Sequence, residues 1–379
     1  MTMRSISLFM PSFGKCRDAK PRPVSGTRPV SKRMLFAGVL ALGIACTAAA
    51  DAQSATLVSG LMSAQPLTGV AATERLPGSD APAYRALQEG RVEDAQNLLN
   101  ANLAQNPGDA MAHQILCRVY YAQDAADAAI HQCELAVSSD PNSLQASDHE
   151  LWLGRAYGLK ARHAGPFGGF SLARKVRSSF ERAVQLNPSN VAALSDLGEY
   201  YIAAPTIVGG GIDKAQALAA RMMPQFPTAA HRLLARIAEA GGDPVAAESE
   251  FKQAVAAQKT PEAWIDLAHF YEAHNRPDDA LNAVKSGLAA DRAHGAVLVD
   301  AASILTAAHR APELAERCLR TYLASPAKSD AAPAFKVHLQ LSRLLSARGD
   351  AAEASQEVAT AAALAPAFTR RGARPAQGS

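Results

Sequence analysis

The chain has 379 residues, of which 48% are apolar and 6% are aromatic. This content is enough for a large core, and the scarcity of alternating Val, Ile, Thr and Tyr residues argues against a β-sheet architecture. Residues 1–52 carry eight of the 38 basic and two of the 35 acidic residues, so the remainder of the chain is slightly acidic. The charge of the folded part therefore gives no argument for nucleic-acid binding, and we expect no nucleic-acid partner.

The first 52 residues have the features of a secretory signal. Lys32 and Arg33 precede the apolar run 34–45, and a small-residue cleavage site follows at 50–52. We therefore expect residues 1–52 to be a signal peptide with a long basic leader, and the mature protein to begin at Gln53 in the periplasm. Two alternatives stay open: an uncleaved anchor, for which the run is short against the roughly 20 residues of a bilayer span, or lipidation at Cys46. The membrane would be a partner only in these two cases.

Two further segments are expected to lack structure. Residues 53–80 are small, polar and rich in Pro and Gly, which predicts a flexible tether. Residues 369–379 are expected to form a disordered basic tail. Residues 81–368 lie between them and carry one recurring pattern.

The recurring pattern is a Leu–small pair, an aromatic residue or Leu three positions on, a turn, and then an Ala–apolar–Ala series that often ends at Pro. The pairs are Leu116–Cys117, Leu153–Gly154, Leu197–Gly198, Leu234–Ala235, Leu267–Ala268, Ala301–Ala302 and Leu341–Ser342. A partial copy precedes them with Gly90, Ala95, Leu99 and Pro107. This pattern resembles the tetratricopeptide repeat (TPR), which has a period of about 34 residues.

The resemblance implies an all-α fold. It predicts a right-handed α-solenoid, a superhelix of antiparallel helix hairpins, with about seven TPR-like repeats and an N-terminal half repeat. Small residues let the two helices of a hairpin approach closely, and Pro ends the second helix because its ring removes a donor and clashes with the preceding turn. Each hairpin leaves an apolar face that only the next hairpin can cover.

Catalytic motifs are missing from the sequence. It has no His-Glu-x-x-His, no Gly-x-Ser-x-Gly and no Walker-type sequence, and the glycine-rich segment 209–214 has the wrong spacing for a phosphate loop. We expect no enzyme, no cofactor and no metal site. His113, His231 and His338 fall at the fourth repeat position, where packing or capping is the expected role.

A candidate binding face follows from the repeat register. In TPR superhelices the ninth position of each first helix points into the concave groove. Here that position holds Arg118, Arg155, Glu199, Arg236, His269, Ser303 and Arg343, and Tyr121 lies one turn beyond Arg118. Guanidinium groups bind carboxylates through two parallel hydrogen bonds.

The residues proposed to bind are Arg118, Tyr121, Arg155, Arg236 and Arg343. Their partner would be a protein segment or peptide with acidic or C-terminal carboxylate groups. The favoured alternative is a solvated charged face, in which the arginines pair with Glu199, Glu239 and Glu272.

Two turns are longer than the repeat period allows, at residues 159–170 and 204–213. A solenoid places equivalent turns side by side on one rim, so we expect a loop patch of Phe167, Phe170, Ile207 and Val208. Mutual packing is the favoured role of this patch, and ligand binding is the alternative.

A narrower resemblance covers the same region. Residues 157–215 are similar to a group of bacterial exported TPR proteins of undefined role, and residues 205–215 resemble the TPR component of TRAP-type transporters. The expected function is therefore a periplasmic scaffold or adaptor that binds a protein segment or peptide in its groove. A small-ligand-binding accessory component of an envelope transporter is the alternative, and an unrecognised enzyme is the third.

Three cysteines remain after the leader: Cys117, Cys133 and Cys318. Cys117 and Cys133 occupy positions eight and twenty-four of one repeat, on opposite helices and equally far from the turn near Ala125. A disulfide requires Cα atoms about 4.4–6.8 Å apart and an oxidising compartment. Two buried thiols that fill space are the favoured alternative, because helix seams often hold Cα atoms farther apart. Cys318 is expected to stay free.

Overall fold

The computed structural model describes residues 80–162 and 164–373, and the side chains at 166–167 and 370–373 lie outside the described part. The expected signal peptide, residues 53–79 of the tether and residues 374–379 of the tail also lie outside it. The described residues form 17 α-helices, the 3-10 helix η1 (Thr206–Val208) and no strand. The first eight helices are α2 (Ala81–Gln88), α3 (Val92–Gln105), α4 (Ala110–Ala122), α5 (Ala126–Ser139), α6 (Ala146–Ala161), α7 (Pro166–Leu186), α8 (Val191–Ala203) and α9 (Ile212–Met222). The others are α10 (Pro227–Ala240), α11 (Pro244–Ala257), α12 (Pro261–Ala273), α13 (Pro277–Ala290), α14 (Val297–Ala307), α15 (Pro312–Ala324), α16 (Ala334–Arg348), α17 (Ala351–Leu364) and α18 (Pro366–Ala373).

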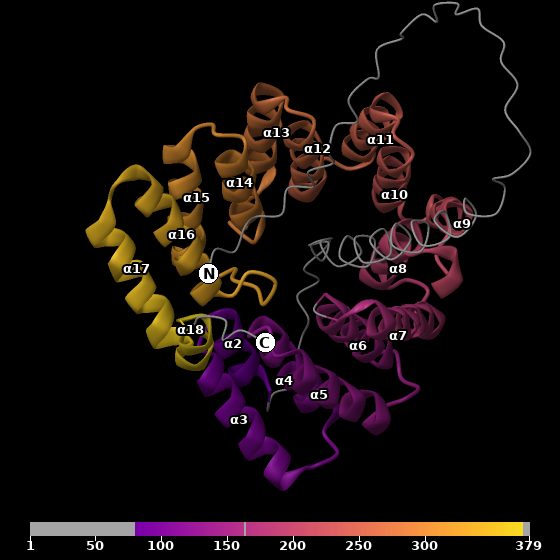
Figure 1. The fold of residues 1–379 in the computed structure, drawn as a ribbon, viewed down its shortest axis with the longest axis vertical. Helices are drawn as coiled ribbons and strands as arrows, with labels where there is room; N and C mark the ends of the chain where they lie inside the picture. Colours follow the sequence, from indigo (N-terminus) through magenta and orange to yellow (C-terminus); the bar gives the residue numbers. More distant parts are fainter. Residues whose placement is uncertain (1–79, 163, 374–379) are drawn as a thin grey trace, which may run out of the picture.

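Consecutive helices from α2 to α17 pair into hairpins that stack into a solenoid (Figure 1). The predicted all-α TPR-like solenoid is therefore confirmed. The N-terminal copy differs in one respect from the expected half repeat, because the 8-residue helix α2 completes it as a hairpin. At the other end, α18 continues past residue 368 into the segment expected to be a disordered tail.

The turns inside the hairpins use a left-handed residue at equivalent places. These residues are Gly90, Asp124, Gly242, Asn275, His309 and Gly349, all with positive φ. Glycine has no Cβ to clash in this conformation, and Asp, Asn and His tolerate it better than most residues do. The chain thus reverses direction once in each of these hairpins without a longer loop.

Small residues set the spacing between paired helices. Ala129, Ala136, Ala215, Ala247 and Ala280 are completely buried at their expected repeat positions. A Cβ added at Gly154 would lie 2.5 Å from Cε1 of Phe180 on α7, so only glycine fits where α6 and α7 cross. These contacts explain why alanine and glycine replace the large side chains of an ordinary core.

The fourth-position histidines connect the two helices of their hairpins. Nδ1 of His113, His231 and His338 lies 2.5–2.8 Å from the side-chain oxygen of a residue 19 positions later. The partners are Gln132, Glu250 and Glu357 respectively. The histidines thus have the packing role expected from their register.

The solenoid curves until its ends meet, so that α2 and α3 lie beside α17 and α18 in a closed ring (Figure 1). Phe335 and Ala365 are fully buried in the apolar cluster formed by α2, α3 and α4. Glu93 on α3 accepts a hydrogen bond of 2.9 Å from the backbone N–H of Ala367. Lys336 on α16 lies 3.5 Å from Asp124 in the turn after α4. The sequence predicted a superhelix with a groove, and its closure into a ring was not predicted.

Candidate functional site on the inner face

The first helices of the hairpins line the inner side of the ring. Successive first helices from α2 to α14 contact one another, whereas no comparable contact joins second helices in the described chain. In Figure 1, α8, α14 and α16 lie nearer the middle of the ring than α9, α13 and α17 do. The even-numbered helices therefore present the expected groove residues to the interior.

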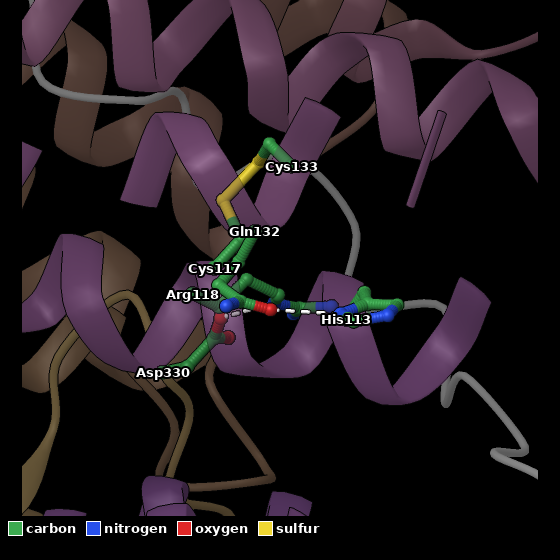
Figure 2. The surroundings of a disulfide bond; sticks show 6 residues. All are labelled: His113, Cys117, Arg118, Gln132, Cys133 and Asp330. Carbon is green, nitrogen blue, oxygen red and sulfur yellow. Dashed lines mark hydrogen bonds and ion pairs between the residues drawn. A yellow bond between two sulfur atoms is a disulfide. The ribbon is translucent and has the colours of Figure 1, made fainter. Parts of the chain in front are cut away.

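Arg118 is buried on α4 and holds a carboxylate from a distant loop. Its Nε donates to Oδ2 of Asp330 at 2.6 Å, and its NH2 group donates to the hydroxyl of Tyr84 at 2.8 Å. The guanidinium carbon lies 4.8 Å from the ring centres of Tyr84 and Trp152. Figure 2 shows Arg118 and Asp330 facing each other beside the disulfide.

Arg118 favours the ionised form of Asp330 although the pair is buried. Burial raises the pKa of Asp330, but the charge and hydrogen bond of Arg118 outweigh it, so that the pKa lies below its ordinary value. The two side chains are only 7% and 9% exposed. Removing Arg118 would take away the main positive charge that stabilises the buried carboxylate of Asp330, which is strongly unfavourable.

Arg155 and Tyr121 lie in the same cluster, around Trp152. Nε of Arg155 donates to Oδ2 of Asp196 at 2.7 Å, and the guanidinium carbon is 4.7 Å from the Trp152 ring centre. Tyr121 contacts the same ring edge-on, with centroids 5.5 Å apart. Three of the five predicted residues, Arg118, Tyr121 and Arg155, thus converge on one tryptophan.

The other two predicted residues lie elsewhere. Arg236 on α10 bonds to Glu199 at 3.2 Å and to Glu239 at 2.6 Å, as the charged-face alternative expected. Arg343 on α16 is exposed and has no ion-pair partner in the described part of the chain. The Arg row is therefore paired at Arg118, Arg155 and Arg236 and open at Arg343.

The middle of the inner face contains a further ion pair, which is partly buried. Oδ2 of Asp266 on α12 lies 2.9 Å from Nε of Arg232 on α10. Burial raises the pKa of Asp266 to about 6 although Arg232 and Arg236 act in the opposite direction. The Arg232–Asp266 pair joins two neighbouring first helices, as the Arg155–Asp196 pair does.

The residues of the expected loop patch are divided between the core and the surface. Val208 is buried, and its carbonyl accepts a 2.8 Å hydrogen bond from the hydroxyl of Tyr200. Phe170 is partly buried against the same core cluster, whereas Ile207 is 70% exposed. The side chain of Phe167 lies outside the described part. The four residues thus do not share one exposed surface.

The turn expected at residues 159–170 is shorter in the structure. Helix α6 continues to Ala161 and α7 begins at Pro166. Proline occupies the first turn of α7, where its missing N–H has no partner to lose. The expected loop is therefore largely helix.

The two expected partners in a possible disulfide are bonded in the structure. Cys117 on α4 and Cys133 on α5 form a disulfide with a Cα–Cα distance of 5.3 Å, and both are completely buried (Figure 2). The favoured prediction, two free buried thiols, is therefore wrong, and the alternative disulfide is present. Cys318 is free and buried, and burial raises its pKa to about 11.

Sequence reasoning missed three members of the inner-face cluster: Tyr84, Trp152 and Asp330. Trp152 directly precedes the Leu153–Gly154 pair, and the residue at the same place in the next copy is Asp196. A side chain at the ninth position can contact the residue that directly precedes the Leu–small pair of the next copy. Arg118 contacts Trp152 in this way, and Arg155 contacts Asp196. For Asp330 the sequence offered one signal. The separation between Ala302 and Ser342 along the sequence is longer than one repeat, which indicates a long link between two hairpins.

A surface hollow of about 480 Å³ lies between α11, α12 and α13, away from the predicted residues. Trp264, Tyr271 and Lys252 are among its lining side chains. Among the described residues, no helix is long and apolar enough to cross a bilayer. That part of the chain also has no group of three or more His, Cys, Asp or Glu side chains arranged to hold a metal ion.

Similarity to known proteins is found in the helical repeats. The tetratricopeptide repeat family model matches residues 86–147. No curated protein matches the chain. Solved structures that resemble it include a thermophilic TPR protein from Thermus thermophilus, with 23% identity, a TM-score of 0.38, and coverage of 52% of this chain and 99% of that one. Yeast Tom70 has 15% identity, a TM-score of 0.47, and coverage of 86% and 69%.

A third similar structure is PilW, a type IV pilus biogenesis factor, with 16% identity, a TM-score of 0.39, and coverage of 56% and 94%. The family match falls on the first two hairpins, and the later hairpins repeat their construction, with alanines at the seam and a left-handed residue in most turns. The described residues therefore form an all-helical array of the tetratricopeptide type, and residues 86–147 match that family.

Proposed function

We propose that this protein is an exported scaffold that binds an acidic segment of another protein on the inner face of its ring. Tetratricopeptide proteins typically bind protein partners. One observation carries the choice of face: Arg118 on the inner face already binds a carboxylate that comes from a loop and not from a neighbouring first helix. Export rests on the signal pattern of residues 1–52.

Arg343 supports the same face as a binding surface. It is exposed at the ninth position of α16, and only the short helix α18 follows the hairpin of α16 and α17. By contrast, Arg155 at the ninth position of α6 is paired with Asp196 of the next first helix. Arg343 therefore keeps a guanidinium available for a carboxylate of the partner.

The small-ligand alternative has less support. It required a pocket built from the loops 159–170 and 204–213, but Val208 is buried and Phe170 packs on the core. Lys214 donates to the carbonyl of Gly209 at 2.9 Å, which ties the second loop to the start of α9. We therefore favour a protein partner.

The test uses Arg343→Glu in the exported protein. Replacing Arg118, Arg155 or Arg236 would be ambiguous, because an unpaired buried carboxylate would destabilise the fold by roughly 3–5 kcal/mol. Arg343 is exposed, so its replacement leaves folding unchanged. A partner is first recovered from envelope extracts with the parent protein and then purified.

We expect Arg343→Glu to weaken binding of the purified partner at least about tenfold, because a charge-assisted hydrogen bond is worth about 1.5–3 kcal/mol. Raised salt should weaken the parent complex in the same direction. The matched control is Arg310→Glu, at a partly exposed arginine that pairs with Asp278 in the turn between α14 and α15. A partner that binds Arg343→Glu as tightly as the parent would contradict binding through this end of the inner face.

A further inference from the structure

The surface hollow between α11, α12 and α13 lies on the outer side of the ring. Its walls are the second helices α11 and α13, and its floor is the first helix α12, which lies between them. Both walls belong to the outer layer of the ring (Figure 1). The volume of about 480 Å³ is within the range of sites that bind small molecules. The hollow is therefore a site separate from the inner face.

The hairpin of α12 and α13 departs from the others where it lines this hollow. In three hairpins the fourth position is a histidine, and its Nδ1 bonds to a glutamine or glutamate 19 positions later. Here the same two positions hold Trp264 and Ala283. The methyl group of Ala283 is much smaller than a glutamine or glutamate side chain, and Trp264 is only partly buried beside it. The exchange of both residues thus creates a recess with an aromatic face.

The indole ring of Trp264 stands on a rigid base. A Cβ added at Gly287 on α13 would lie 3.2 Å from Cβ of Trp264 and 3.3 Å from the carbonyl oxygen of Pro261, so α13 packs tightly against the start of α12. Val255 and Leu267, which also line the hollow, are buried. A fixed aromatic face with apolar surroundings favours stacking of a planar ring.

The charged groups at one end of the hollow neutralise one another. Glu248 pairs with Lys252 at 2.8 Å and with Arg276 at 2.5 Å. Arg276 also pairs with Asp279 at 2.7 Å. The hydroxyl of Tyr271 donates to Glu248 at 3.1 Å, which closes this end. Two positive and two negative charges thus cancel here.

The other end of the hollow carries a positive charge that nothing balances. Lys259 follows the end of α11, and Trp264 lies in the first turn of α12, so the two residues are at the same end. Lys259 is exposed and has no ion-pair partner among the residues that the structure describes. The opposite wall adds the side chains of Asn282 and Ser286. The charge of the hollow therefore complements an anion.

We propose that this hollow binds a small planar aromatic molecule that carries an anionic group. Its ring lies against Trp264, and its anionic group lies at Lys259. An aliphatic anion has no ring to stack on the indole, and a neutral aromatic molecule leaves Lys259 without a counter-charge. The site differs from the pocket that was expected from the loops 159–170 and 204–213, and it requires no protein partner on the inner face.

The experiment measures the binding of naphthalenesulfonate to the exported protein by isothermal titration calorimetry. Naphthalenesulfonamide serves as the neutral aromatic comparison, and octanesulfonate as the aliphatic one. We expect saturable binding of naphthalenesulfonate to one site per chain, and weaker binding of both comparison compounds. The proposal is overturned if naphthalenesulfonate shows no saturable binding, or if either comparison compound binds as tightly.

The first variant, Lys259→Gln, tests the anion contact. It should weaken naphthalenesulfonate about fivefold, because the contact is a single exposed ion pair. Binding of the neutral sulfonamide should not change. The matched control is Lys285→Gln, at an exposed lysine of α13 that does not line the hollow. It should behave as the parent, and a Lys259→Gln protein that binds the sulfonate as tightly as the parent would overturn the proposal.

The second variant, Trp264→His with Ala283→Gln, tests the aromatic face. It introduces the pair that His113 and Gln132 form in the hairpin of α4 and α5. The new side chains should fill the recess and remove the stacking surface, so saturable binding of naphthalenesulfonate should be lost. A folded double variant that binds as the parent does would contradict the proposal. If the double variant does not fold, Lys259→Gln decides, because Lys259 is exposed. Neither variant involves Arg343, so the result is independent of the proposed scaffold function.

Discussion

Gly90 lies where the two ends of the solenoid touch. Its φ is +79°, and a Cβ added there would stand 2.6 Å from the backbone N of Phe335 and 3.2 Å from that of Ala334. The residue therefore meets two requirements at once: a left-handed turn between α2 and α3, and close approach to the start of α16. Only glycine meets both without displacing backbone.

Gly90→Ala should destabilise the protein more than Gly349→Ala does. Both exchanges impose the left-handed penalty of roughly 1–2 kcal/mol. At Gly349, with φ +93°, the added Cβ would meet nothing within 4 Å, whereas at Gly90 it would strike the last repeat. Urea unfolding of the two variants measures the difference, and equal losses of stability would mean that the closure contact at Gly90 is absent in solution.

At the scale of the helices, ion pairs and one covalent bond hold neighbouring elements together. The disulfide Cys117–Cys133 ties α4 to α5, and Cys117 directly precedes Arg118. It therefore fixes the helix that carries Arg118. Hairpins elsewhere rely on noncovalent contacts between alanine-rich faces.

A count of free thiols tests the bond. The exported protein, unfolded without reductant, should show one reactive thiol per chain, that of Cys318, and three thiols would mean that the bond does not form. Because the bond closes a segment with a sequence separation of 16, reduction should lower the free energy of unfolding by up to about 3 kcal/mol. A variant with alanine at both Cys117 and Cys133 should lose this sensitivity to reductant.

At the scale of the whole molecule, the ring is closed by few groups. Phe335 packs fully buried among residues of α2, α3 and α4, with its ring centre 5.0 Å from that of Phe368. The ion pairs Arg118–Asp330 and Lys336–Asp124 flank this apolar contact. Closure therefore depends on a small interface that joins the first and last repeats.

Phe335→Ala should open the ring, and Phe251→Ala should not. Both phenylalanines are buried, and each truncation should destabilise the protein by about 3–5 kcal/mol. Phe251 packs within the array against Phe270, so its loss weakens one seam between α11 and α12. Small-angle scattering should show a larger radius of gyration for Phe335→Ala alone, and an unchanged radius would argue against closure through this contact.

Local sequence features predicted most of the fold. Each hairpin is specified by residues within one repeat of about 34, so the alanine positions, the turn residues and the fourth-position histidines could all be read in order. Two local features misled the prediction. Helix α2 is too short to show its repeat pattern. The segment 159–170 was expected to be a long turn, although its Pro166 is also favoured at the first turn of a helix.

The sequence alone determined that Arg118 and Arg155 face the inside of a helical array, because the face of a side chain follows from its place in the repeat. Only the tertiary structure decided that Asp330 meets Arg118 across 212 positions. That contact depends on the summed curvature of all the hairpins between them, and the small rotation from one repeat to the next is set by many side-chain contacts at once. No local pattern encodes this sum, so ring closure and the internal carboxylate became visible only in the folded chain.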